Sequence, residues 1–157
     1  MAVLALLALP GAAMANDWLY APVVAACFAS GEADCIGEAA TMCMTEEPDG
    51  ETTVGMMSCL MAEHQVWDGL LNAEYTKARD HAAMLDAADA PTFPAFAVRA
   101  DQVRDAQRAW IAFRDANCAM QYGLWGAGSM RQIAGADCVM RMTATQTIAL
   151  RDYHDTP

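Results

Sequence analysis

The sequence has little positive charge and few of the residues that most often carry out catalysis. Its 157 residues include only 9 Lys and Arg against 20 Asp and Glu, so the net charge is −11. Charge of this sign argues against binding to nucleic acid or to anionic membrane surfaces. The chain has only 3 histidines, and no Ser or Cys stands in a recognisable nucleophile context. We therefore expect a protein that is not an enzyme and that has no cofactor.

Long hydrophobic runs and CxxC motifs are also missing. Beyond the first residues, no segment reaches the ~18–20 apolar residues that a membrane span needs. Without a CxxC motif, zinc ribbons and thioredoxin-like redox sites are disfavoured. The cysteines are therefore expected to serve a structural purpose.

The first 15 residues, MAVLALLALPGAAMA, have the pattern of a secretory signal peptide. A short apolar stretch ends in Ala-Met-Ala at residues 13–15, a small-x-small cleavage pattern. The positive charge that usually precedes such a stretch is limited to the amino terminus. A buried N-terminal helix is the alternative, but the stretch has no polar face. We expect residues 1–15 to be a signal peptide and residues 16–157 to form one periplasmic or secreted domain.

Six cysteines in a small exported chain predict three disulfides. The pair Cys118–Cys138 is the easiest to argue, because it closes a glycine-rich connection between two expected helices. It would add about 3 kcal/mol in the loop-entropy model. Sequence alone leaves other connectivities open. For the other four cysteines we favour Cys27–Cys35 and Cys43–Cys59.

Helical periodicity dominates the chain, and strand-like alternation never extends beyond a few residues. Asp34 is a plausible N-cap of the second helix, and Thr52 or Thr53 of the third. The pattern predicts an all-α, disulfide-stapled bundle built on an antiparallel hairpin of two long helices. The expected helices cover about 23–29, 34–45, 53–88, a segment ending near 119, and 137–153, with a loop at 121–136.

The segment Ala106–Cys118, AQRAWIAFRDANC, is the most distinctive in the chain. On a helix it has an apolar face and a charged face, which is typical of a helix packed on a core. Gln107 and Arg114 border the apolar face, where each needs a hydrogen-bonding partner. The apolar face comprises Val103, Ala106, Trp110, Phe113 and Asn117, and the opposite face comprises Asp101, Arg104, Arg108, Ala112 and Asp115.

A matching amphipathic segment lies upstream, at residues 62–75. Glu63 and Glu74 border its apolar face. Glu63 is a natural partner for Arg114, because a guanidinium binds a carboxylate through two parallel hydrogen bonds. We expect a structural ion pair; a ligand-binding pair is the alternative. The expected polar core comprises Glu63, Gln107, Arg114, Trp67 and Trp110, and the apolar face of the upstream helix comprises Leu60, Trp67, Leu71 and Ala78.

Together these segments resemble the LprI-like lysozyme inhibitor family of small bacterial envelope proteins. The resemblance covers roughly the last 100 residues and is most specific at AQRAWI.FRDA.C. It implies a secreted helical domain whose partner is a lysozyme. Gln146 is a departure, because the family often has Arg three residues after the Thr. The resemblance rests on Cys59, Glu63, Trp67, Asp68, Leu71, Asn72, Tyr75, Gln107, Trp110, Arg114, Cys118, Gly128, Ser129, Cys138, Thr143 and Leu150.

The 12 methionines make a periplasmic copper-binding protein an alternative. Met57, Met61, His64 and Asp68 lie within about 60° of one another on the expected long helix, and the first three are the candidate ligands. Thioether sulfur together with imidazole suits Cu(I). Methionine also fills irregular cores, so we expect no metal. A structural envelope protein without a ligand is a further alternative.

Two surface features are candidates for binding a partner. An acidic turn at residues 46–51 suits a cationic protein such as a lysozyme, since many lysozymes are strongly basic. Trp125, in a glycine-rich loop, would be an anchor if it is exposed. The alternative is that Trp125 folds back over the end of the bundle. The acidic residues of the turn are Glu46, Glu47, Asp49 and Glu51.

Overall fold

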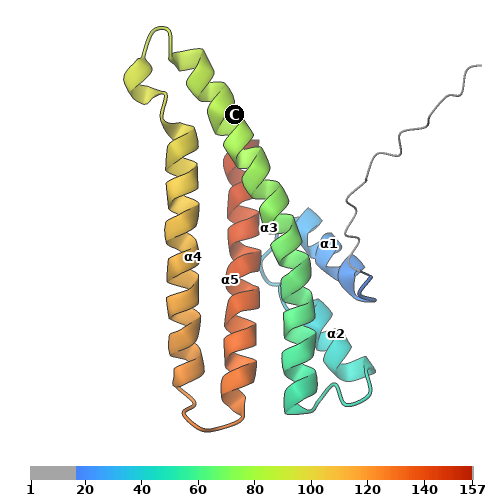
Figure 1. Cartoon of the computed structure of the whole chain (residues 1–157). Helices are drawn as coiled ribbons and strands as arrows, with labels where there is room; N and C mark the ends of the chain where they lie inside the picture. The colour runs from blue at the N-terminus through green and yellow to red at the C-terminus, as the bar shows by residue number, and fades with distance from the viewer. Residues whose placement is uncertain (1–16, 157) are drawn as a thin grey trace, which may run out of the picture.

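The computed structural model describes residues 17–156, so the expected signal peptide at 1–15 lies outside the described residues. The described chain is all-α, as predicted (Figure 1). Among these residues, no helix is long and apolar enough to cross a membrane. The elements are α1 (Ala21–Ser30), α2 (Glu38–Glu46), α3 (Thr53–Asp89), the short 3-10 helix η1 (Pro94–Phe96), α4 (Arg99–Gly123) and α5 (Met130–Asp155).

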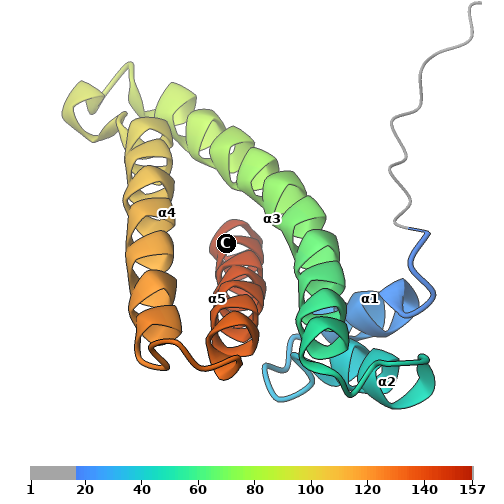
Figure 2. The same cartoon turned by 60° about the horizontal axis from the view of Figure 1, so that its bottom comes forward.

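Three long helices form the body of the molecule. α3 and α4 run in opposite directions and are joined at the end that carries η1, while α5 returns alongside α3 (Figure 1). The most extensive packing is between α3 and α5, and α4 contacts both less closely. α3 curves around α5, and away from their shared turn α3 and α4 diverge (Figure 2). The α3–α5 pair, rather than an α3–α4 hairpin, is therefore the centre of the bundle.

The core follows from the spacing of large apolar residues on α3. Leu60, Trp67, Leu71 and Ala78 are all buried, as their helical period predicts. α5 supplies small residues and Met140 opposite them, so the two helices approach closely. The sequence therefore determines this face of α3 by periodicity alone.

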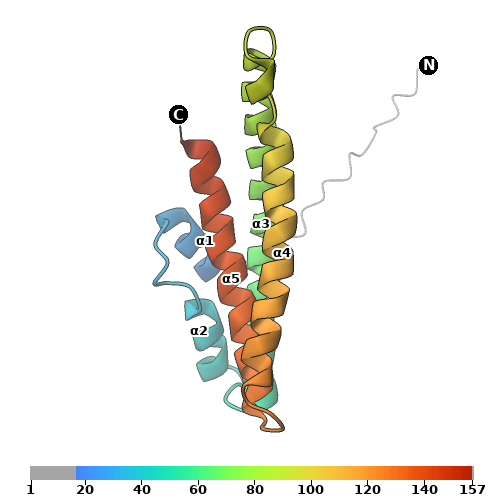
Figure 3. The same ribbon diagram turned by 90° about the vertical axis from the view of Figure 1, so that its left-hand side faces the viewer.

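α1 and α2 cover the side of α3 and α5 that faces away from α4 (Figure 3). Glu63 of α3 holds the N-terminus of α2: its Oε1 accepts from the Gly37 N–H (2.8 Å) and its Oε2 from the Ala40 N–H (2.7 Å). Trp67 Nε1 also donates to Glu63 Oε1 (3.0 Å). The first N–H groups of a helix lack internal partners and carry partial positive charge, so a carboxylate is favoured there. The predicted pairing of Glu63 with Arg114 is wrong for this reason.

Two arginines of α5 bind the region where α1 leads into α2: Arg151 contacts the end of α1, and Arg141 contacts the connecting loop. Arg151 Nη1 donates to the Phe28 carbonyl (2.6 Å), near the C-terminus of α1, and its guanidinium lies 5.2 Å from the Phe28 ring centre. Arg141 Nη1 donates to the Ile36 carbonyl (2.8 Å). Gly37 has φ +98°, and a Cβ there would lie 2.8 Å from Arg141 Nη2. This position therefore needs glycine both for its backbone angle and for the approach of the arginine.

All six cysteines are paired, as Cys27–Cys35, Cys43–Cys59 and Cys118–Cys138. These are the pairs that the sequence favoured. The first closes the turn between α1 and α2, and the second fixes α2 to α3. The third joins α4 to α5 next to their connecting loop.

Two predicted boundaries are wrong. α2 begins at Glu38 rather than near Asp34, because Cys35 is tied to Cys27 and the chain turns at Gly37. The predicted loop at 121–136 is reduced to residues 124–129, since helix continues on both sides of it. The Thr52 cap of α3 is confirmed, because its Oγ1 accepts from the Gly55 N–H (3.0 Å).

Candidate partner-binding surface

α4 presents only part of the predicted apolar face to the bundle: Val103 and Trp110 pack against the core, and Asn117 Nδ2 donates to Met142 Sδ (3.3 Å). Gln107 and Cys118 are its buried residues, whereas Ala106 is exposed and the Phe113 side chain is 61% exposed. Gln107 is oriented inward because Gln146 Nε2 of α5 donates to its Oε1 (2.9 Å). The inward face is therefore rotated toward Gln107, and Phe113 faces solvent.

Arg114 is partly buried, with its side chain 16% exposed, but it pairs with Asp115 rather than with Glu63, its predicted partner on α3. Its Nη2 lies 2.8 Å from Asp115 Oδ1, and its guanidinium lies 5.1 Å from the Trp110 ring centre. The predicted polar core is thus divided between two places. Glu63 and Trp67 bind α2, whereas Trp110 and Arg114 lie together on α4 beside Gln107.

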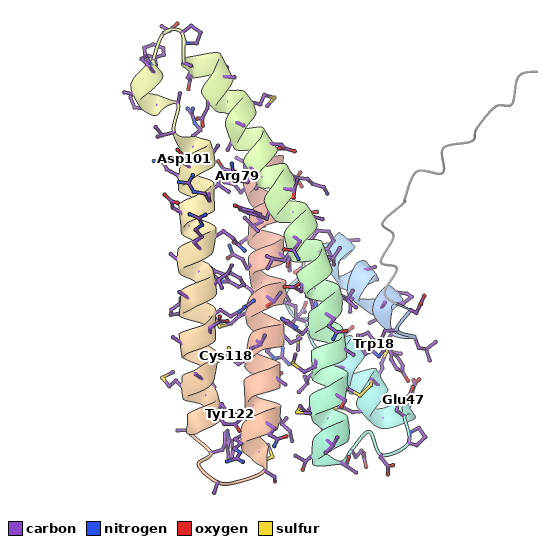
Figure 4. All side chains as sticks on the ribbon, in the orientation of Figure 1. Trp18, Glu47, Arg79, Asp101, Cys118 and Tyr122 are labelled. Atoms are coloured by element: carbon purple, nitrogen blue, oxygen red, sulfur yellow. A yellow bond between two sulfur atoms is a disulfide. The ribbon has the colours of Figure 1, made fainter. Side chains whose placement is uncertain are left out.

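An apolar groove of about 710 Å³ opens where α4 diverges from α3. Small residues of α5 form its floor, and Tyr122 at the end of α4 packs over Gly135, where a Cβ would lie 3.2 Å from Tyr122 Cδ2. Cys118 and Tyr122 lie on the side of α4 that faces α5 (Figure 4). The lining residues are Met57 and Met61 of α3; Asp115, Cys118, Ala119 and Tyr122 of α4; and Gln132, Gly135, Ala136 and Val139 of α5.

His64 lies on α3 one turn beyond Met61, the second of the groove methionines. Its Nε2 atom is buried and has no hydrogen-bonding partner among the described residues. Burial lowers the pKa of His64, the Arg114 charge lowers it further, and Asp68 opposes this in part. The imidazole is therefore neutral at neutral pH, with an unused nitrogen.

The acidic turn and the α4–α5 loop lie at the same end of the molecule (Figures 1 and 3). All four carboxylate residues at 46–51 are exposed. Trp125 in the α4–α5 loop is 47% exposed, and Leu124 beside it is more exposed still. The groove opens between α3 and α4 near this end, because it is lined by the first turns of α3 and α5 and the last turns of α4. We call these three features together the acidic end.

The acidic turn belongs to the part of the chain that carries the net negative charge. All 9 Lys and Arg residues occur from Lys77 onward, where carboxylates equal them in number. The whole net charge of −11 therefore belongs to the first 76 residues, which include the acidic turn.

A second exposed apolar group lies at the opposite end, around η1. Phe93 and Phe96 are both mostly exposed and contact each other edge to face. The nearby carboxylates Asp86 and Asp89 share the cation Arg99 (3.3 and 2.6 Å), so their negative charge is partly offset. The two ends thus differ in charge rather than in exposed apolar surface.

Sequence reasoning identified the acidic turn and Trp125 but missed the groove between them. Its floor lies in the segment that was expected to be a loop. The available signal was the pair Gly135-Ala136, since small residues on a helix permit a large side chain such as Tyr122 to pack closely.

Comparison with known families identifies the family of the chain. The model of the family described as "Lysozyme inhibitor LprI" matches residues 43–150. The match extends from α2 through most of α5 and includes the residues that line the groove. No curated protein and no solved structure matches the chain. Because the match covers most of its length, the chain belongs to the LprI lysozyme inhibitor family.

Proposed function

We propose that this protein acts outside the cytoplasm by binding a lysozyme and inhibiting it, and that it does so with the acidic end. Three facts support the proposal: membership of an inhibitor family, the signal-peptide pattern at residues 1–15, and three disulfides, which persist in oxidising compartments. The observation that carries the choice of surface is the coincidence of uncompensated acidic side chains and exposed apolar side chains at one end.

Charge and apolar surface have separate tasks in this proposal. Carboxylates at the rim of an interface steer a basic partner and accelerate association. Buried aromatic and apolar anchors mainly slow dissociation. The acidic turn supplies the first property, and Trp125 with the groove supplies the second. The end around η1 has apolar surface too, but its carboxylates Asp86 and Asp89 are paired with Arg99, so they attract a basic partner less strongly than the unpaired carboxylates of the acidic turn do.

A rigid scaffold suits such a function. The disulfide Cys43–Cys59 fixes the acidic turn at its base, and Cys118–Cys138 fixes the α4–α5 loop. Surfaces held in place before binding lose less conformational entropy when the partner docks.

The decisive experiment measures cell-wall lysis by a basic lysozyme at low salt, with and without the oxidised protein. Inhibition at near-stoichiometric ratios is expected. Full lytic activity at a large molar excess of the protein would remove the inhibitor function.

The surface is tested by neutralising the acidic turn with Glu46→Gln, Glu47→Gln, Asp49→Asn and Glu51→Gln together. Asn tolerates the positive φ of Asp49 (61°), so the turn should be retained. We expect association to slow by about tenfold or more at low salt, with little change in dissociation. The matched control makes the same change in net charge elsewhere, and equal slowing in both would refute the assignment of the surface. The control replaces the exposed residues Asp80, Asp101, Asp105 and Asp155 with Asn.

A separate variant tests the anchor. Trp125→Ala should accelerate dissociation and leave association nearly unchanged. Phe93→Ala, at the opposite end, is the matched control for loss of an exposed aromatic ring. An unchanged dissociation rate for Trp125→Ala would show that the ring only covers the end of the bundle.

A further inference from the structure

Two methionines pack at the edge of the core and also line the open groove. The chain has 12 methionines, and two of those on α5 have structural roles. Met140 is fully buried in the core, and Met142 Sδ accepts a hydrogen bond from Asn117 Nδ2 (3.3 Å). Met57 and Met61, by contrast, are only partly buried and both line the open groove. Their thioethers are therefore accessible from solvent at one place.

His64 completes a set of three on the same face of α3. Residues at positions i, i+4 and i+7 lie within about 60° around a helix, and neighbouring members are about 5–6 Å apart at Cβ. The spacing of Met57, Met61 and His64 follows this pattern. Long, flexible methionine side chains can bring their sulfur atoms toward the imidazole of His64 over such distances.

The unused Nε2 of His64 is the observation that points to a ligand. A buried polar atom without a partner costs free energy, and such an atom in a native structure needs an explanation. An imidazole nitrogen and two thioethers on one face of a helix form a donor set for a soft monovalent metal ion. Every cysteine is held in a disulfide, so no thiolate among the described residues competes for that ion.

We propose that Met57, Met61 and His64 form a binding site for Cu(I) on α3, at the edge of the groove that the two methionines line. Two thioether sulfurs and the His64 Nε2 atom supply three neutral ligands, a number and type that suit this ion. Arg114 contributes positive charge nearby, and its ion pair with Asp115 offsets that charge. The site does not depend on the proposed lysozyme binding, since none of its ligands belongs to the acidic turn or to Trp125.

The test is a competition titration of the oxidised protein with a coloured Cu(I) chelator, under nitrogen and with ascorbate, which leaves disulfides intact. One equivalent of Cu(I) should bind with a dissociation constant below about 1 µM. Ag(I), a redox-inert substitute, should shift the NMR signals of the Met57 and Met61 methyl groups and of the His64 ring. Failure to compete with the chelator, or unchanged signals, would overturn the proposal.

Variants locate the site. Met57→Leu with Met61→Leu keeps volume and apolar character, so the fold should be retained, and circular dichroism checks this. Cu(I) affinity should fall by at least about thirtyfold in this variant and in His64→Gln. Met84→Leu, an exposed methionine of the same helix, is the matched control and should bind as the unchanged protein does. Equal affinity in all variants would place the ion elsewhere and refute the proposal, whereas the lysis assay would be unaffected by that result.

Discussion

Glu63 gives the sharpest test of how the fold is held together. Its side chain is 1% exposed, and three buried donors point at its two oxygens: the N–H groups of Gly37 and Ala40 and the indole N–H of Trp67. Glu63→Gln retains the shape of the side chain but replaces one oxygen with an NH₂ group. Whichever way the amide is turned, at least one buried N–H then faces another donor.

The expected cost follows from these contacts. One buried N–H without an acceptor costs about 1–3 kcal/mol, and loss of the negative charge at the start of α2 costs about 0.3–1 kcal/mol more. We therefore expect Glu63→Gln to lower the free energy of unfolding by about 2–4 kcal/mol. Glu63→Ala leaves all three donors without acceptors and also opens a cavity, so it should cost about 4 kcal/mol or more.

Urea and thermal unfolding with the disulfides intact measure this effect. At about 2–4 °C per kcal/mol for a chain of this size, Tm should fall by roughly 4–16 °C in Glu63→Gln. The matched control is Asp80→Asn, an exposed carboxylate of the same helix, which should change stability by less than about 0.5 kcal/mol. Hydrogen exchange should accelerate most at the amides of Gly37 and Ala40. A Glu63→Gln protein as stable as the control would refute the capping role.

Three further outcomes follow from other contacts. Arg114→Ala should lower the free energy of unfolding by about 1 kcal/mol, measured by urea unfolding. The change removes packing over the Trp110 ring and leaves the exposed carboxylate of Asp115 without its partner. The control Arg108→Ala, on the exposed side of α4, should cost less than about 0.5 kcal/mol. Burial raises the pKa of Glu74, but hydrogen bonds from the Lys77 ammonium and the His154 ring outweigh burial and hold the pKa below its usual value. Its contribution to stability is therefore complete above the unfolded pKa of about 4.3 and is lost as pH falls through the folded pKa, so Glu74→Gln should flatten acid unfolding curves in that range. Replacing Cys118 and Cys138 together with Ser should lower stability by about 3 kcal/mol in calorimetry, since the bond closes a loop with a sequence separation of 20 residues.

The sequence predicts α3 well because its inward face is made of large apolar residues at helical spacing. Trp67 and Leu71 have no other place in a small helical protein than against a second helix. The disulfide pairs follow in the same way, since each joins segments that are close along the chain. Local spacing carries the information in both cases.

α4 is harder to predict because its partners are distant in sequence. Gln107 points inward because it meets Gln146, which is 39 residues away, and this rotates Phe113 to the surface. A pattern of apolar residues cannot show that an amide will be buried in place of a phenylalanine. The groove is hidden for a similar reason: its floor is a helical segment whose glycine content indicated a loop.

Three carboxylates of α3 show how the fold divides its negative charge. Glu63 binds the start of α2, and Glu74 Oε2 lies 2.6 Å from His154 Nε2 in the last turn of α5. Asp86 accepts from the N–H groups of Arg99 and Ala100 (3.0 Å each) at the start of α4. Each of these charges is used within the molecule, where a helix end or a cation offsets it.

The carboxylates of the acidic turn have no such cationic partner among the first 76 residues, since the first Lys or Arg is Lys77. These four carboxylates are exposed and take part in none of the ion pairs among the described residues, so under the proposed function they can attract a basic partner to the end where the groove opens.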